Sequence, residues 1–406
     1  MSTSEIVYFD YNATTPLGPA ARRALIGHLD DYENPSSLYP RARAVKETLE
    51  EARGRLAGAL GASEAEVIFT ASGTEAINMA LLGVALRRPR RPCHIITTRI
   101  EHAATLTACQ QLEGWGVRVD YLPVDGKGRV SPDDVRAAIS SDTTLIAVMH
   151  ANNEVGVVQP IGDISRIARD HGVLLLTDAV QTVGKLRVEF DQAGFDMMAV
   201  SAHKFQGPKG MGALVRRRNL PIEPLINGGG QESGMRGGTE NVCGAVAMAA
   251  AADEALHDLE VKQASIGRLR DRLWSAISEL EGVRLNSALD LALPGTLNVS
   301  FRSIKGDALA TALAFDGIAV STGSACHAKE AKPSHVLTAM GIGEEWLFGA
   351  VRFSLGPRNT VEEVDFAAEK LRSAVARFRS MCPRTKQSPS AALGNEAGSC
   401  NPARSS

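Results

Sequence analysis

The side chains best suited to chemistry in this 406-residue sequence follow short apolar runs, where buried strands are expected to end. Lys204 stands three residues after the run Met197–Ser201, and Asp178 follows the run Val173–Leu176. A lysine amine in a partly desolvated pocket can form a Schiff base with an aldehyde. Because ligands of open parallel sheets bind beyond the carboxyl ends of the strands, we expect Lys204 and Asp178 to share one binding site.

Other residues meet the further demands of pyridoxal phosphate, the common aldehyde partner of such a lysine. Gly73 and Thr74 begin a predicted helix, whose N–H groups and dipole favour a phosphate, although a hydroxyl there is also an ordinary helix cap. Asp178 can keep the pyridine nitrogen protonated, and His102 can lie over the face of the ring. Together with Lys204, these residues predict a pyridoxal phosphate site.

Short apolar runs alternate with longer helical stretches, a pattern typical of an α/β domain with a mostly parallel sheet. The predicted strands of this sheet are Val67–Phe69, Ile95–Thr97, Leu145–Met149, Val173–Leu176, Met197–Ser201 and Gly212–Val215. Predicted helices include Leu49–Leu60, Thr74–Leu86 and a long alanine-rich region from about Val242 to Leu280.

A second α+β unit is predicted beyond this region, with strands Thr296–Phe301, Ile318–Ser321 and Arg352–Ser354 and helices Asp307–Phe315 and Val361–Phe378. We expect residues 15–260 to form a large cofactor domain, and residues 1–14 with 261–382 to form a smaller one. Residues 383–406 are rich in Ser, Pro, Ala and Gly and hold no aromatic residue, which predicts a disordered tail.

Charge and hydropathy argue against several classes of protein. The net charge is −2, so a main role in binding nucleic acid or an anionic membrane is not expected, and the arginine clusters at 87–91 and 216–218 are interpreted as solvated loops. No apolar run approaches the roughly 18 residues of a membrane span, and the sequence shows no secretory signal. These features predict a cytoplasmic protein.

The six cysteines predict neither a disulfide framework nor a zinc site, because none form a CxxC pair or a suitably spaced cluster. No metal site is predicted. Cys326 differs from the other five because it follows the small-residue run Ser321–Ala325, which is typical of a loop. A cysteine that acts as a nucleophile must be an accessible thiolate, and a loop of this kind suits that requirement.

In order and spacing, many short segments resemble the cysteine desulfurases of the NifS/IscS type, across about residues 6–380. These enzymes belong to the class-V pyridoxal phosphate enzymes with the aspartate aminotransferase (type I) fold, so the resemblance implies that fold. The matching segments are Tyr8–Pro16, Asn34–Ser37, Phe69–Glu75, Glu101-His102, Asn152–Gly156, Asp178–Gln181, Ser201–Lys204, Gly228–Glu232, Gly238–Asn241, Ser321–Cys326 and Arg352–Gly356.

The resemblance also implies roles for individual residues. Lys204 would bind the cofactor as a Schiff base, Asp178 would contact the pyridine nitrogen, and His102 would stack on the ring. The ring hydroxyl would be bound by Asn153 and Gln181, the substrate by Asn12 and Arg352, and the phosphate by Gly73, Thr74, Ser201 and His203, with Thr239 from the partner subunit of a homodimer.

The reaction that the resemblance implies converts L-cysteine to L-alanine and leaves the sulfur on Cys326 as a persulfide. Cys326 could also serve as a transient iron–sulfur ligand. The partners implied are L-cysteine and a sulfur-acceptor protein, either an iron–sulfur scaffold or a thiolation protein. The sequence does not identify which acceptor is used, and it gives no role for the tail.

Some positions favour other interpretations. Tyr39 stands where many desulfurases have histidine, and together with the pair Cys326-His327 it is similar to selenocysteine lyases, whereas Ser324 beside Ala325 is similar to the desulfurase form. Arg358 lies one residue further along than expected, so its role stays open. The alternatives to a cysteine desulfurase are therefore a selenocysteine lyase and a non-catalytic partner protein with the same fold.

Overall fold

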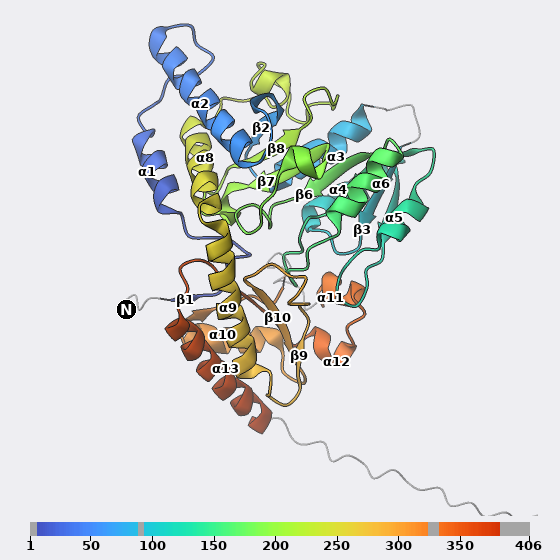
Figure 1. Cartoon of the computed structure of the whole chain (residues 1–406), viewed down its shortest axis with the longest axis vertical. Helices are drawn as coiled ribbons and strands as arrows, with labels where there is room; N and C mark the ends of the chain where they lie inside the picture. The colour runs from blue at the N-terminus through green and yellow to red at the C-terminus, as the bar shows by residue number, and fades with distance from the viewer. Residues whose placement is uncertain (1–5, 88–92, 324–332, 382–406) are drawn as a thin grey trace, which may run out of the picture.

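The computed structural model describes residues 6–87, 93–323 and 333–381 (Figure 1). Its largest feature is a seven-stranded sheet in which only β8 runs against its neighbours, so the sheet is mostly parallel. The strands, in order across the sheet, are β2 (Val67–Thr70), β8 (Gly212–Arg216), β7 (Met197–Ser201), β6 (Leu174–Asp178), β5 (Thr143–Ala147), β3 (His94–Thr98) and β4 (Arg118–Leu122).

Helices cover both faces of this sheet because its strands are apolar on both sides. Successive side chains of a strand point to opposite faces, so Ile68 packs into one core and Phe69 into the other. The core that contains Ile68 is formed with α3 (Gly73–Leu86) and α4 (Ala103–Gly114). The opposite core is formed with α1 (Pro19–Gly27), α2 (Pro40–Ala59), α5 (Pro132–Ala138), α6 (Ile161–Asp170), α7 (Phe190–Ala193) and α8 (Val242–Leu256).

A smaller antiparallel sheet has its own apolar core and lies below the large sheet in Figure 1. Its order is β12-β10-β9, from β12 (Ala350–Ser354), β10 (Thr296–Phe301) and β9 (Val283–Leu285). The helices α9 (Leu259–Ile277), α10 (Gly306–Phe315) and α13 (Val361–Met381) contribute to this core. Two short helices, α11 (His335–Ala339) and α12 (Glu344–Leu347), pack against residues that follow β5.

The N-terminal segment connects the two parts of the molecule. Its strand β1 (Val7–Tyr8) pairs in parallel with β11 (Ile318–Ala319), and Asp10 forms a bridge to Ser354 at the end of β12. A few residues later, Thr15 donates its backbone N–H to the carbonyl of His203, just after β7. Residues 7–15 therefore run from the small sheet to the edge of the large one.

The predicted strands all correspond to observed ones, with small shifts such as Thr143–Ala147 in place of Leu145–Met149. The helix predicted from Leu49 begins earlier, at Pro40, because proline is well suited to the first helical position. The long helical region is broken into α8 and α9 at Asp258, whose φ of 50° is left-handed. Among the described residues, no helix is long and apolar enough to cross a membrane.

Candidate active site

A cavity of about 250 Å³ lies at the carboxyl ends of β6 and β7, at the edge that residues 7–15 reach. Most of the predicted site residues line it, although they come from segments far apart in the sequence. Those residues are Asn12, Gly73, Thr74, His102, Asn153, Asp178, Gln181, Ser201, His203, Lys204 and Arg352. The convergence of these residues on one cavity follows from the parallel strands, whose carboxyl ends meet at one edge.

The phosphate end of the predicted site is the N-terminus of α3. Ser72 caps this helix by accepting the backbone N–H of Glu75 at 3.1 Å. A Cβ atom on Gly73 would lie 2.7 Å from a methyl carbon of Val180 and 3.2 Å from the Cβ of Ser201, so only glycine fits. The first N–H groups of a helix have no partner within it, which makes this turn suitable for binding an anion.

Lys204 lies immediately after β7, in a short 3-10 turn over Ala202–Lys204. Its Nζ donates hydrogen bonds to the backbone carbonyls of Asn12, at 2.6 Å, and Ala13, at 2.8 Å. These carbonyls belong to the segment that arrives from the small sheet. The amine is therefore held at the cavity wall by backbone oxygens from the N-terminal segment.

Asp178 and His102 face the same cavity, and burial favours the uncharged form of both side chains. Asp178 accepts the backbone N–H of Val180 at 2.9 Å, and burial raises the pKa of its carboxyl. Burial likewise lowers the pKa of His102, against the attraction of Asp178. A cation beside Asp178, such as a protonated pyridine nitrogen, would offset the cost of burying its charged carboxylate.

The tautomer of His102 is set by its position as the N-cap of α4. Its Nδ1 accepts the backbone N–H of Ala104 at 3.1 Å. A ring nitrogen that accepts a hydrogen bond carries no proton, so the neutral imidazole holds its proton on Nε2. Nε2 is therefore the atom through which His102 can exchange a proton with a ligand.

His203 also stays uncharged near neutral pH. Burial, reinforced by Lys204, lowers the pKa of His203 to about 4. Its Nδ1 lies 3.0 Å from the hydroxyl of Thr14, and its backbone carbonyl accepts from Thr15. Ser201, two residues earlier, is buried at the end of β7.

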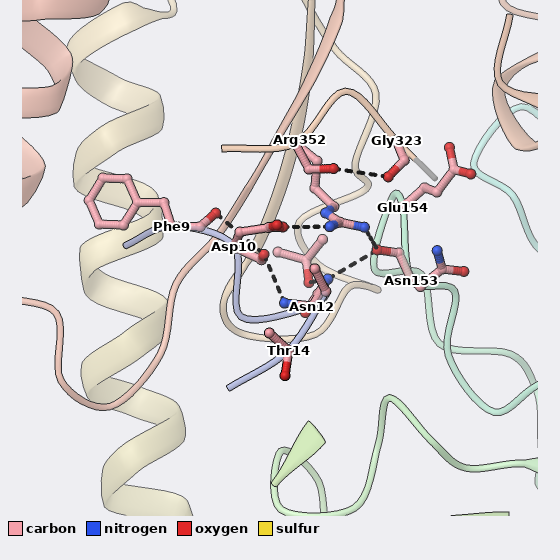
Figure 2. A network of polar contacts seen from close by, with 12 residues as sticks. Phe9, Asp10, Asn12, Thr14, Asn153, Glu154, Gly323 and Arg352 are labelled. Atoms are coloured by element: carbon pink, nitrogen blue, oxygen red, sulfur yellow. Dashed lines mark hydrogen bonds and ion pairs between the residues drawn. The ribbon is translucent and has the colours of Figure 1, made fainter. Parts of the chain in front are cut away.

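Arg352, on β12, brings a guanidinium to the cavity from the small sheet (Figure 2). Its Nη2 donates to Asp10 Oδ1 at 2.6 Å, and its Nη1 donates to the backbone carbonyl of Asn153 at 3.0 Å. Its Nε is buried and makes no hydrogen bond in the described part of the chain. An arginine held in this way keeps further N–H groups for a carboxylate, which a guanidinium binds as a fork.

Sequence reasoning gave no role to Asp10 or Lys185, although both touch predicted site residues. Lys185 Nζ donates to Asn12 Oδ1 at 2.8 Å and to Gln181 Oε1 at 2.7 Å. Asp10 stands in the quoted segment Tyr8–Pro16, and Lys185 lies four residues after Gln181. Each of them could have been identified from the sequence as a charged residue within or close to a predicted binding segment.

Three further residues named from the sequence are not among the described residues that line this cavity. Thr239 lines a different, smaller cavity with Phe69 and Arg236, and its predicted role belongs to the site of a partner subunit. Cys326 falls outside the described residues. Arg358, whose role the sequence left open, donates from an exposed position to the backbone carbonyl of Leu17 at 2.9 Å.

The features of the cavity fit pyridoxal phosphate. A helix N-terminus with a glycine that no other residue can replace suits the phosphate, and a lysine at the cavity wall suits the aldehyde. The buried carboxyl of Asp178 suits a protonated ring nitrogen. Among the described residues, no group of three His, Cys, Asp or Glu side chains is placed to hold a metal ion.

Comparison with known proteins places the chain among relatives of one kind. Residues 7–366 match the family model described as aminotransferase class-V. A curated "Cysteine desulfurase IscS" from Dictyoglomus turgidum is 41% identical over 379 residues, which cover 93% of this chain and 96% of that protein. Another of that name, from Methanosarcina thermophila, is 42% identical over 94% of this chain and 95% of its own length.

Solved structures agree with these relatives. A structure titled "NifS-like protein" superimposes with a TM-score of 0.87 at 39% identity, covering 92% of this chain and all of that one. A second, titled "SspA in complex with cysteine", has a TM-score of 0.78 at 36% identity and covers 87% of this chain and all of its own. The predicted fold is thereby confirmed. The chain belongs to the class-V aminotransferase family and, within it, to the cysteine desulfurases, which depend on pyridoxal phosphate.

Proposed function

We propose that the cavity at the ends of β6 and β7 is where this enzyme binds pyridoxal phosphate and removes sulfur from L-cysteine. The observation that carries this proposal is the meeting of Lys204, Asp178, Arg352 and the N-terminus of α3 around one cavity. A phosphate, an aldehyde, a ring nitrogen and a substrate carboxylate each find a suitable group there.

The residues that would hold the cofactor are those predicted from the sequence. Gly73, Thr74, Ser201 and His203 would bind the phosphate, with Thr239 contributed by the partner subunit of a homodimer. Asp178 would pair with the ring nitrogen, His102 would lie against the ring, and Asn153 and Gln181 would contact the ring hydroxyl. Lys204 would bind the aldehyde. The contacts of Lys204 and Gln181 with the N-terminal segment support this arrangement, because they fix both side chains at the cavity.

When bound, pyridoxal phosphate supplies an electron sink that stabilises negative charge at the α-carbon of an amino acid. Arg352 binds the substrate carboxylate and so orients the α-carbon. Asn12, the other predicted substrate residue, already donates its side-chain N–H groups to Thr296 and Asn153, so it must exchange one of these bonds to contact the substrate. Lys204 Nζ then takes the α-proton. His102 Nε2 is placed to exchange a proton within the cavity, because Nδ1 is occupied by the N–H of Ala104.

Cys326 is the nucleophile in this proposal. Its thiolate attacks the sulfur of the substrate, so an S–S bond forms while the C–S bond breaks. The electron pair of the C–S bond stays on the carbon, which gains a proton and becomes the methyl group of alanine. Cys326 is left as a persulfide, and a sulfur-acceptor protein, either an iron–sulfur scaffold or a thiolation protein, would receive this sulfur.

The division into domains remains a prediction. Two sheets with separate apolar cores support a cofactor domain of residues 15–260 and a smaller domain formed by residues 1–14 and 261–382. The pairing of β1 with β11 supports assigning the N-terminal residues to the smaller domain. The homodimer and the cytoplasmic location are likewise proposals that follow from the family and the composition.

The test is to purify the protein, record its absorbance spectrum, and measure release of alanine and of sulfide or selenide from cysteine and selenocysteine in parallel. We expect a visible cofactor band and turnover of cysteine. Strong rejection of cysteine with turnover of selenocysteine would instead identify a selenocysteine lyase. A purified protein without a cofactor band that also binds no added pyridoxal phosphate would contradict the proposal.

A further inference from the structure

A second lysine lies beside the cavity, in the turn that follows β6. Lys185 is a half-buried residue whose Nζ contacts two amide oxygens, Oδ1 of Asn12 at 2.8 Å and Oε1 of Gln181 at 2.7 Å. It comes from the same turn as Gln181, whereas Asn12 comes from the N-terminal segment. Both amides line the proposed cofactor cavity, whereas Lys185 lines a neighbouring cavity that also includes Asn12.

These contacts fix the orientation of both amides. An amide has an acceptor oxygen at one end and a donor nitrogen at the other, and its two orientations are nearly isosteric. Asn12 Nδ2 donates to the hydroxyl of Thr296 at 2.9 Å and to the carbonyl of Asn153 at 3.2 Å, so its oxygen must face Lys185. The rest of the hydrogen-bond network therefore agrees with the orientation that Lys185 requires.

As a result, Gln181 presents a hydrogen-bond donor to the cavity. Its oxygen is taken by Lys185, and its Nε2 donates one N–H to the backbone carbonyl of Asn12 at 2.9 Å. An amide nitrogen carries two hydrogens, so one N–H remains for an acceptor in the cavity. With the opposite orientation, Gln181 would present an oxygen there, which could accept from a ligand O–H group but could not donate to a ligand oxygen.

We propose that Lys185 is a positioning residue that makes Gln181 present an N–H group, rather than an oxygen, to the ring hydroxyl of the cofactor. Lys185 acts through Gln181 and does not itself touch the cofactor. The inference rests on the proposed function, because it takes the cofactor to be pyridoxal phosphate.

The positioning does not depend on whether Lys185 is charged. Burial, together with the charges of Lys204 and Arg352, places the pKa of Lys185 well below its ordinary value. A neutral amine still has two N–H groups, which are enough for the two amide oxygens, and an ammonium has three. A methionine at this position would fill a similar volume and donate nothing.

The experiment compares two cofactors rather than two activities. Pyridoxal phosphate and its 3-deoxy analogue, which lacks the ring hydroxyl, are titrated into the apoenzyme, and the dissociation constant of each is measured by absorbance and fluorescence. We expect the unaltered protein to bind pyridoxal phosphate about tenfold more tightly than the analogue, the worth of one hydrogen bond in a buried site. Lys185→Met, in which only the Asn12 carbonyl still orients the Gln181 amide, should lose part of that preference by weakening pyridoxal phosphate alone.

Four further variants, three single and one double, separate positioning from folding. Lys262→Met is the matched control, because Lys262 lies nearby and its Nζ donates to the carbonyl of Glu254 rather than to a residue of the cofactor cavity, so the preference should be retained. Lys185→Arg, which still donates, should restore part of the preference. Gln181→Ala should abolish it, and adding Lys185→Met to that variant should change nothing further. Melting temperatures identify any variant that fails to fold.

The possible failures are distinguishable. If the unaltered protein binds neither compound, the proposed function is wrong. If Lys185→Met or a folded Lys185→Leu, neither of which can donate a hydrogen bond, prefers pyridoxal phosphate as strongly as the unaltered protein does, the positioning role is wrong. The positioning role is equally wrong if the unaltered protein binds both compounds tightly and equally, because Gln181 then makes no contact with the ring hydroxyl.

Discussion

Arg352 Nη2 lies 2.6 Å from Asp10 Oδ1, so the guanidinium that faces the active-site cavity is already paired with a carboxylate (Figure 2). Only 3% of the Arg352 side chain is exposed, and a buried arginine without such a partner would be costly. Asp10 holds the guanidinium through one nitrogen and the carbonyl of Asn153 holds it through another. The orientation of the fork is thus fixed before a substrate arrives.

Replacing Arg352 should affect substrate binding more than the chemical step. A lysine has no planar fork, so Arg352→Lys should raise the KM for cysteine about tenfold or more, with a smaller change in kcat. Steady-state alanine formation measures both. The matched control is Arg358→Lys, because Arg358 is exposed and its guanidinium donates to the backbone carbonyl of Leu17, and its KM should change less than about twofold. A fall in kcat at unchanged KM would contradict the proposed role of Arg352.

Adding one carbon to Gly73 should weaken cofactor binding. In Gly73→Ala the new Cβ would lie 2.7 Å from Val180, so the first turn of α3 must shift away from the phosphate. We expect affinity for pyridoxal phosphate to fall at least about tenfold, measured by titrating the apoenzyme. Gly58→Ala in α2 is the control, because nothing lies within 4 Å of its added carbon, and its affinity should be unchanged.

Removing the thiol of Cys326 should separate cofactor binding from sulfur transfer. We expect Cys326→Ala to keep the visible cofactor band and to form neither a persulfide nor alanine from cysteine, because no nucleophile attacks the substrate sulfur. Cys243→Ala should behave as the unaltered enzyme does. Persulfide labelling followed by mass spectrometry identifies the cysteine that is modified. Full turnover by Cys326→Ala would refute the role.

His150 should make the protein less stable in acid. Burial lowers the pKa of His150 to about 4, so the unfolded chain binds a proton below pH 6.5 that the folded chain does not. The contribution of neutral His150 to the free energy of unfolding is fully present above pH 6.5 and is lost as the pH falls toward 4. Between pH 7 and pH 5 the loss from this one group is on the order of 2 kcal/mol.

Urea denaturation at both pH values measures this loss. His150→Gln cannot take up the proton, so its free energy of unfolding should change less between pH 7 and pH 5 than that of the unaltered protein. His257→Gln is the matched control, because the side chain of His257 is 79% exposed, and its pH dependence should match that of the unaltered protein. An unchanged pH dependence in His150→Gln would show that another group is responsible.

Most residues of the cavity could be picked out from the sequence because they follow predicted strands. Lys204 and Asp178 follow apolar runs that could only be buried strands, and a parallel sheet brings such ends together. Lys185 was missed because its importance depends on Asn12, which is 173 residues away in the sequence. No local pattern reports a contact of that kind.

The ends of helices were harder to predict from the sequence than the strands were. The first half of α2, from Pro40, buries only the small side chains of Ala42 and Val45, whereas the second half buries Leu49 and Leu56, so only the second half was predicted. The break between α8 and α9 depends on the left-handed backbone of Asp258. Aspartate tolerates this conformation, but an aspartate in the sequence does not predict it. The roles of Cys326 and Thr239 stay predictions.

The path of residues 7–15 has a consequence for the order in which the protein is made. Asn12 donates its backbone N–H to Ser354, a residue 342 positions later in the chain, while its carbonyl holds Lys204. The N-terminal segment is synthesised first, yet it cannot reach its final place until β11 and β12 have been translated. The large sheet can therefore form early on the ribosome, before the N-terminal segment takes its final place beside Lys204. A nascent chain acquires its complete active site only near the end of translation.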